Sequence, residues 1–226
     1  MDIASRVQHT LLRPDCTEDE VRRVVMAASQ VHLAAVSVLP VWARFAVTAA
    51  ASSPVRVSVP VGYPLGTHTA SVKGLEARLA LEEGAAEIVL VPNLSAFKSG
   101  RREVFRQDLD YMLKHCRQTN PDAMVQVLVY ADLLSPTELG QVVRIVRDSG
   151  GHFILLGTYA PQPPSAAEVR QWLPSFAPGI VIGVMAPVRT AETARKILAL
   201  DIARLATPWG IEVVEEVLGR DGEMAR

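Results

Sequence analysis

Cysteine is scarce in this chain, and the familiar metal-binding spacings are missing. Cys16 and Cys116 are the two cysteines, and neither belongs to a Cys-x-x-Cys motif. No His-x-x-x-His motif or paired carboxylate group appears, so no metal site is expected. Two isolated cysteines are typical of plain thiols in a reducing compartment, and we therefore expect a cytoplasmic protein.

The sequence also lacks an excess of charge and any long apolar run. The formal net charge of −1 offers no basic field for nucleic acid or for an anionic membrane, so neither is an expected partner. Residues Met1 to Arg6 lack the apolar run of a signal peptide. No uninterrupted apolar segment is long enough to span a bilayer.

Short apolar segments with strand character alternate with helical segments along the chain. Strands are expected near residues 8–12, 34–39, 56–62, 86–91, 124–130, 153–157, 179–185 and 203–207. Capping boxes predict helix starts at the pairs Thr17 with Glu20, Ser135 with Glu138, and Ser165 with Glu168. Eight strand and helix units favour one (β/α)8 TIM barrel domain over residues 1–226, rather than an open sheet.

Several short motifs occur in an order and spacing that resemble those of a known enzyme family. They are Gln8-His9-Thr10-Leu11-Leu12-Arg13-Pro14-Asp15, Gly62-Tyr63-Pro64-Leu65-Gly66, Ala96-Phe97-Lys98-Ser99-Gly100 and Val188-Arg189-Thr190. From about Ile3 to about Glu216 the chain is similar to deoxyribose-phosphate aldolase. The resemblance implies a (β/α)8 barrel that cleaves deoxyribose 5-phosphate reversibly, without a cofactor, through a lysine Schiff base.

The residues that perform this chemistry in the family are replaced here. By the resemblance, the Schiff-base lysine falls on Leu155, and the second lysine, which lowers the pKa of the first, falls on Met185. The proton-transfer aspartate falls on Val89, and another pocket aspartate falls on Gln8. An imine requires an amine, so Leu155 and Met185 cannot form one. The sequence therefore predicts a divergent aldolase-like barrel without Schiff-base chemistry.

The four lysines of the chain offer no obvious replacement for the missing amine. Lys114 and Lys196 are expected on outer helices, whereas Lys73 and Lys98 match family lysines that are not the nucleophile. Catalysis in these barrels takes place at the C-terminal ends of the strands, so an amine elsewhere does not serve. A relocated nucleophile is therefore not favoured.

The loops that hold phosphate in the family differ as well. By the resemblance they correspond to Ala186-Pro187-Val188 and Ala206-Thr207-Pro208-Trp209-Gly210. Proline removes a backbone donor and tryptophan fills space, so a 5-phosphate sugar is an unfavourable ligand. Arg13 and Arg189 remain available to meet an anion, although arginines in such positions are more often solvated or ion-paired.

Alternation along the strands predicts which residues face the barrel interior and its mouth. The expected ligand-binding residues are Gln8, Thr10, Val89, Asn93, Gln126, Tyr130, Leu155, Thr158, Tyr159, Met185 and Trp209. This lining is neutral and largely apolar, which indicates a small-molecule ligand of similar character. The alternative is that Tyr130, Tyr159 and Trp209 fill a pocket that has closed.

The catalytic residues are not fixed by the sequence. Tyr130, Tyr159, His68 and Asp132 are the candidates, with His68 in a loop on the predicted functional face. Asp132 has an alternative role in the turn before a helix. His9 is expected to point away from the mouth, because it alternates with Gln8 and Thr10.

Three hypotheses about function stay open at this point. The first is a repurposed enzyme, a lyase, isomerase or cyclase of a biosynthetic pathway that acts on a neutral, largely apolar molecule. The second is a pseudoaldolase that regulates or partners an active homologue. The third is an ordinary deoxyribose-phosphate aldolase. A homo-oligomer is compatible with each of them.

Overall fold

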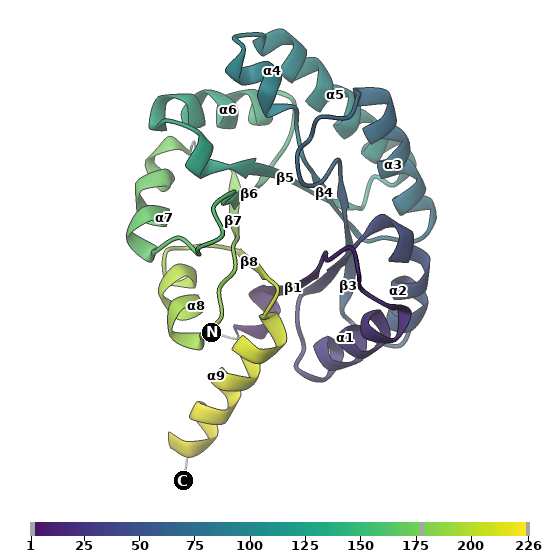
Figure 1. Ribbon diagram of the computed structural model, residues 1–226, viewed down its shortest axis with the longest axis vertical. Helices are drawn as coiled ribbons and strands as arrows, with labels where there is room; N and C mark the ends of the chain where they lie inside the picture. The colour runs from purple at the N-terminus through teal and green to yellow at the C-terminus, as the bar shows by residue number, and fades with distance from the viewer. Residues whose placement is uncertain (1–2, 177–178, 225–226) are drawn as a thin grey trace.

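The computed structural model describes residues 3–176 and 179–224, and its strands form a closed barrel (Figure 1). Every neighbouring pair of strands is parallel, and β8 closes the ring against β1. The strands are β1 Val7–Leu11, β2 Ala35–Val38, β3 Arg56–Val61, β4 Glu87–Leu90, β5 Met124–Tyr130, β6 Phe153–Gly157, β7 Val181–Met185 and β8 Arg204–Thr207. The (β/α)8 barrel expected from the sequence is thus confirmed.

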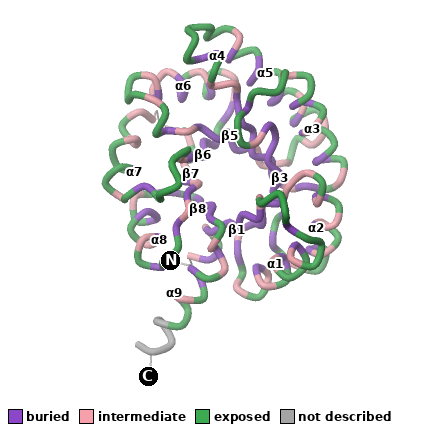
Figure 2. Tube along the Cα trace, viewed as in Figure 1, coloured by how far each residue is buried: buried purple, intermediate pink, exposed green. Residues whose placement is uncertain are grey.

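Helices surround this ring on all sides in Figure 1. They are α1 Glu18–Gln30, α2 Ala43–Ala50, α3 Ala70–Glu82, α4 Leu94–Lys98, α5 Arg102–Thr119, α6 Pro136–Asp148, α7 Ala166–Trp172, α8 Ala191–Leu198 and α9 Gly210–Met224, with the 3-10 turns η1 Ala4–Arg6, η2 Pro40–Trp42, η3 Ala131–Leu133 and η4 Leu173–Ser175. Figure 2 shows the strands as the buried centre and the outer helix faces as exposed. The large apolar core therefore lies between the barrel and its helices.

Local sequence signals account for where the elements begin. All eight expected strands form, with ends within two residues of the expected ones. Thr17, Ser135 and Ser165 each cap a helix, and in each case the capping box is complete. These side chains satisfy backbone N–H groups that an uncapped helix would leave unpaired.

The strand registers arrange the inward-facing residues in layers of four, each contributed by alternate strands. From the N-terminal ends of the strands toward the C-terminal ends, the layers are Ala35, Glu87, Phe153 and Arg204; then Gln8, Ser58, Gln126 and Gly183; then Ser37, Val89, Leu155 and Ala206; then Thr10, Pro60, Leu128 and Met185. The interior is therefore polar in its lower half and largely apolar above.

An ionic group closes the lower end of the interior. The buried carboxylate of Glu87 accepts hydrogen bonds from the side chains of Gln126 at 2.8 Å and Arg204 at 3.3 Å. Arg56 pairs with the same carboxylate at 2.8 Å. The desolvation of Glu87 is thus offset by three donors, which is the condition for a charge to be tolerated in a core.

Within residues 3–176 and 179–224, no helix is both long enough and apolar enough to cross a bilayer.

Candidate functional site

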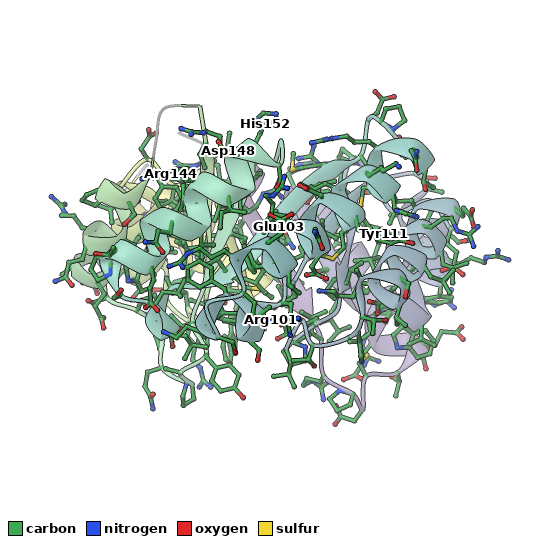
Figure 3. All side chains as sticks on the ribbon, turned by 90° about the horizontal axis from the view of Figure 1, so that it is seen from above. Arg101, Glu103, Tyr111, Arg144, Asp148 and His152 are labelled. Atoms are coloured by element: carbon green, nitrogen blue, oxygen red, sulfur yellow. The ribbon has the colours of Figure 1, made fainter. Side chains whose placement is uncertain are left out.

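A cavity of about 290 Å³ lies at the C-terminal ends of the strands, where barrels of this type carry their sites. Its lining consists of Thr10, Tyr63, Pro64, Tyr130, Gly157, Thr158, Tyr159, Met185, Ala186, Pro187, Ala206 and Pro208. We call this the mouth cavity. Figure 3 shows the barrel from the side, with His152, just before β6, at the upper edge and Arg101, just before α5, in the lower half. The mouth is therefore open in the structure, and the alternative prediction of a pocket filled by its own side chains is not met.

Three tyrosines form one wall of the mouth cavity. The hydroxyl of Tyr130 donates to the carbonyl of Pro64 at 2.7 Å, which connects the end of β5 to the loop after β3. Its ring meets that of Tyr159 edge to face, with ring centroids 5.7 Å apart. Burial raises the pKa of Tyr63 and of Tyr130 above the usual tyrosine value. Both are therefore neutral phenols at physiological pH and unsuited to act as a base. Tyr63 can donate a hydrogen bond to a ligand, whereas the Tyr130 hydroxyl already donates to Pro64.

Asp132 positions part of this wall. Its carboxylate accepts the backbone N–H groups of Tyr159, at 2.9 and 3.0 Å, and of Ala160, at 2.9 Å. Asp132 lies in η3 after β5, so these bonds fasten the loop after β6 to the loop after β5. Asp132 thus lies in the turn before α6, as the alternative prediction had it, and also binds a distant loop. It does not line the mouth cavity.

Leu155 and Val89 lie below the mouth cavity and not in its lining. Leu155 is 0% exposed and packs in an inner apolar cluster with Val89, Val91, Leu128 and Ala206. Met185, one layer higher, packs against this cluster and also lines the mouth cavity. The positions that the resemblance assigns to the reactive amine and the proton relay thus form an apolar floor.

The remaining predicted contacts divide between the cavity and its surroundings. Thr10 and Thr158 line the mouth cavity, and the Thr158 hydroxyl has no hydrogen-bond partner among the described residues. Gln8 and Gln126 face inward but are fully buried in a lower layer. Asn93 caps α4, where its side chain accepts the N–H of Ala96 at 3.0 Å. The expectation that Asn93, Gln8 and Gln126 line the mouth is therefore not met.

Trp209 also lies elsewhere than expected. Its ring is covered by the Arg189 guanidinium, 4.1 Å from the ring centroid, and it packs against the outer core rather than lining the mouth cavity. Its backbone N–H donates to the hydroxyl of Thr207 at 3.3 Å. Strand alternation does not extend to Trp209, because β8 ends at Thr207.

The rim of β7 and β8 offers few free donors to a phosphate. Pro187 and Pro208 line the cavity and have no N–H group. The N–H of Val188 donates to Ala186 at 2.8 Å, and the Thr207 hydroxyl donates to Val188 at 2.7 Å. Arg13, the other candidate for an anion, is paired with carboxylates at 2.7 Å on the surface.

None of the four lysines lines the mouth cavity. Lys73 is fully buried and donates to Asp108 at 2.7 Å and to two backbone carbonyls. Burial lowers the pKa of Lys73, although Asp108 opposes this shift. Lys98 is paired with Glu138 at 2.8 Å, and Lys114 and Lys196 lie on the outer helices α5 and α8, as expected.

The histidines do not enter the mouth cavity. His9 points outward, and its Nδ1 accepts the backbone N–H of Ile211 in α9 at 3.5 Å. Burial lowers the pKa of His9, against the opposing effect of Glu212. His68 is exposed in the loop after β3 and does not line the cavity, so its position gives the catalytic hypothesis no support.

The sequence prediction missed Tyr63 as a lining residue. Tyr63 lies between β3 and α3, beyond the reach of strand alternation. The available signal was its place in the motif Gly62-Tyr63-Pro64-Leu65-Gly66, which was used only for the resemblance. Within the described residues no group bonds to its hydroxyl, so Tyr63 offers the cavity a donor and an acceptor.

The chain is similar to known proteins over nearly its whole length. No family model matches the chain. It is 26% identical over 220 residues to deoxyribose-phosphate aldolase of Enterococcus faecalis, covering 97% of this chain and 99% of the relative. It is 27% identical over 217 residues to the enzyme of that name from Caldanaerobacter subterraneus, covering 96% and 94%.

Solved structures give the same result. An aldolase named QR15 superimposes with a TM-score of 0.91 at 29% identity and covers 99% of each chain. A tetrameric deoxyribose phosphate aldolase from Aeropyrum pernix gives a TM-score of 0.84 at 25% identity, over 96% of this chain and 92% of that one. In sequence and in fold, the chain is a distant relative of the deoxyribose-phosphate aldolases.

Proposed function

We propose that the protein is a repurposed barrel enzyme that acts, without a Schiff base, on a neutral small molecule with substantial apolar surface. Loss of imine chemistry leaves a lyase, isomerase or cyclase of a biosynthetic pathway as the reaction class. Barrels of this type change reaction by changing the residues at the strand ends. No cofactor is invoked.

The observation that carries this proposal is the composition of the mouth cavity. None of the described residues in its lining carries a formal charge. An ionic ligand would lose its hydration there without gaining a partner, whereas an apolar one gains by leaving water. The phenol of Tyr63 and the hydroxyl of Thr158 can donate hydrogen bonds to a ligand carbonyl. The Tyr130 oxygen, whose proton is donated to Pro64, can accept one from a ligand hydroxyl.

A second candidate is a non-catalytic binding protein, a regulator or a partner of an active homologue. It is favoured by the raised pKa values of Tyr63 and Tyr130, which leave no evident base in the cavity lining. Binding of a neutral ligand is common to both candidates, and turnover separates them.

The names of the relatives make deoxyribose-phosphate aldolase activity the hypothesis to test first. We expect the purified protein neither to release acetaldehyde from deoxyribose 5-phosphate nor to be trapped by borohydride in the presence of an aldehyde. Mass spectrometry of the reduced protein decides the question, with an active aldolase as positive control. A specific adduct on any lysine contradicts the proposal.

Ligand preference is measured by thermal shift, because a ligand that binds only the folded state raises its stability. We expect neutral apolar molecules to raise the unfolding temperature and sugar phosphates not to. Met185→Lys, which introduces a charge into the lining, abolishes the shift, whereas Trp209→Ala, outside the lining, leaves it in place. A shift given by sugar phosphates alone refutes the proposal.

Two further expectations accompany this function. The Aeropyrum pernix relative is described as tetrameric, and we propose that this chain is also a homo-oligomer, which light scattering tests by mass. Cys16 and Cys116 are free and buried, which supports a reducing cytoplasm as the compartment and is tested by fractionation of cells.

A further inference from the structure

A group of buried polar side chains lies inside the barrel, below the mouth cavity. It consists of Gln8, Ser37, Ser58 and Gln126, each 0% exposed, and we call it the inner polar cluster. These residues come from β1, β2, β3 and β5, and the registers place them in two consecutive layers. Figure 2 shows the strands of this region as buried.

Most polar atoms of the inner polar cluster have no hydrogen-bond partner within residues 3–176 and 179–224. These atoms are both Nε2 and Oε1 of Gln8, Oγ of Ser37, Oγ of Ser58 and Oε1 of Gln126. The one satisfied group is Nε2 of Gln126, which donates to Glu87. Buried polar atoms are almost always paired, because desolvating one without a partner is costly. The cluster therefore requires a partner that the described chain does not supply.

The lining of the mouth cavity adjoins the cluster beside β1, although no cluster residue is part of that lining. Thr10 and Ala206 line the cavity, and Ala206 is the direct neighbour of Gln8 across the β8 and β1 pair. In the upper of the two layers, the side near β1 carries Ser37, itself part of the cluster, and the small residue Ala206, whereas Val89 and Leu155 fill the other side. A narrow group entering beside β1 would thus pass Ser37 and then meet Gln8.

We propose that the inner polar cluster is the head-group subsite of the mouth cavity, and that it binds a neutral group which both donates and accepts hydrogen bonds, such as a carboxamide or lactam. The proposal rests on the proposed function, since it gives the apolar ligand of the mouth a polar end. The ligand class becomes an apolar body that carries one neutral amide-like head.

The chemistry of the cluster selects this head group. Gln8 presents a donor and an acceptor side by side, which matches a carboxamide. A carboxylate would satisfy Nε2 of Gln8 but would face the unpaired oxygens of Gln8 and Gln126. A cation would leave Nε2 of Gln8 unpaired, and Glu87 is already bonded to Arg56 and Arg204.

Water is the other neutral molecule that donates and accepts, and buried polar groups commonly bind it. A head group that displaces such water increases the affinity of the ligand only if it makes the same hydrogen bonds as the water. A ketone, which only accepts, does not. This difference supplies the test.

The test uses three probes with the same number of heavy atoms: hexanamide, 2-heptanone and hexanoate. Calorimetry measures their binding to the wild-type protein, to Gln8→Met, to Ser37→Ala and to the control Gln118→Met, which changes an exposed glutamine on α5. Both cluster variants remove unpaired buried polar atoms, so we expect them to fold. If one of the two cluster variants fails to fold, the other still provides the test.

We expect wild type and Gln118→Met to bind hexanamide about tenfold more tightly than 2-heptanone, and hexanoate not at all. In Gln8→Met the preference falls to about twofold or less, and in Ser37→Ala it is also reduced. A crystal structure with hexanamide then shows the amide against Gln8. Water retained between Gln8 and the probe overturns the proposal.

The failure of this inference differs from the failure of the proposed function. Equal binding of hexanamide and 2-heptanone, unchanged in Gln8→Met, overturns the head-group subsite but leaves the mouth cavity as a neutral ligand site. If no neutral probe binds, and Met185→Lys changes nothing, the proposed function fails as well.

Discussion

Replacing Leu155 by lysine tests the account of the inner apolar cluster most directly. Leu155 is 0% exposed and surrounded by Val89, Val91, Leu128 and Ala206, none of which pairs with a charge. A lysine fully buried in such surroundings has its pKa depressed by up to about 3–5 units. If its pKa in the folded state falls below 7, folding at pH 7 requires loss of the proton, which costs about 4–5 kcal/mol.

The pH dependence of this cost provides the measurement. Because the folded-state pKa of the new lysine is lowered, the unfolded chain binds the extra proton, and the stability of Leu155→Lys rises with pH up to the unfolded pKa near 10.4. Urea unfolding at pH 7 and pH 9.5 is expected to differ by about 3 kcal/mol more for Leu155→Lys than for wild type. Leu155→Met, of similar length and uncharged, is the control and costs less than about 1.5 kcal/mol at both values.

The same variant also separates structure from catalysis. We expect Leu155→Lys to remain inactive toward deoxyribose 5-phosphate, because Val89 offers no proton relay and the rim at Pro187 and Pro208 offers a phosphate few donors. A destabilisation that is independent of pH refutes the assignment of Leu155 to a charge-free interior. Activity at the level of an ordinary aldolase refutes the reasoning about the proton relay and the rim.

Three other predictions concern residues around the barrel. Asp132→Ala is expected to speed hydrogen exchange at the Tyr159 amide while exchange in the strands is unchanged; an unchanged Tyr159 amide contradicts the anchoring role. Lys73→Met leaves Asp108 buried without its partner and is expected to cost about 3–5 kcal/mol in urea unfolding, and a cost below about 1 kcal/mol contradicts this. Burial raises the pKa of the Cys116 thiol to about 12, so iodoacetamide is expected to label it only after unfolding, and rapid labelling of the native protein rules this out.

The strands could be predicted from the sequence because apolar period and length are local properties. Met124–Tyr130 is found in the structure with the expected bounds, and alternation correctly separated inward Gln8 from outward His9. Depth along the barrel axis could not be predicted in the same way. Whether Gln126 lies at the mouth or below it depends on the stagger between neighbouring strands, which pairing across the whole ring determines.

Residues beyond the strand ends were the least predictable part of the candidate site. Trp209 follows β8, where the chain turns into α9, and its ring lies under Arg189 outside the cavity. Tyr63 and Asp132 reach or support the mouth through loops whose paths depend on contacts distant in sequence. The bond between Lys73 and Asp108 joins α3 to α5, and no periodic pattern in the sequence predicts such a pair.

The bond between Glu87 and Arg204 crosses the diameter of the ring, because β4 and β8 stand opposite each other in the strand order. If the polypeptide were cut between α5 and β5, one fragment would keep Glu87 and Arg56 and the other would keep Gln126 and Arg204. Neither fragment would contain the complete set of donors to the carboxylate. Reassociation of the two fragments restores the three donors to Glu87. Recovery of the bond between Glu87 and Arg204 therefore reports that the barrel has closed, separately from the folding of either half.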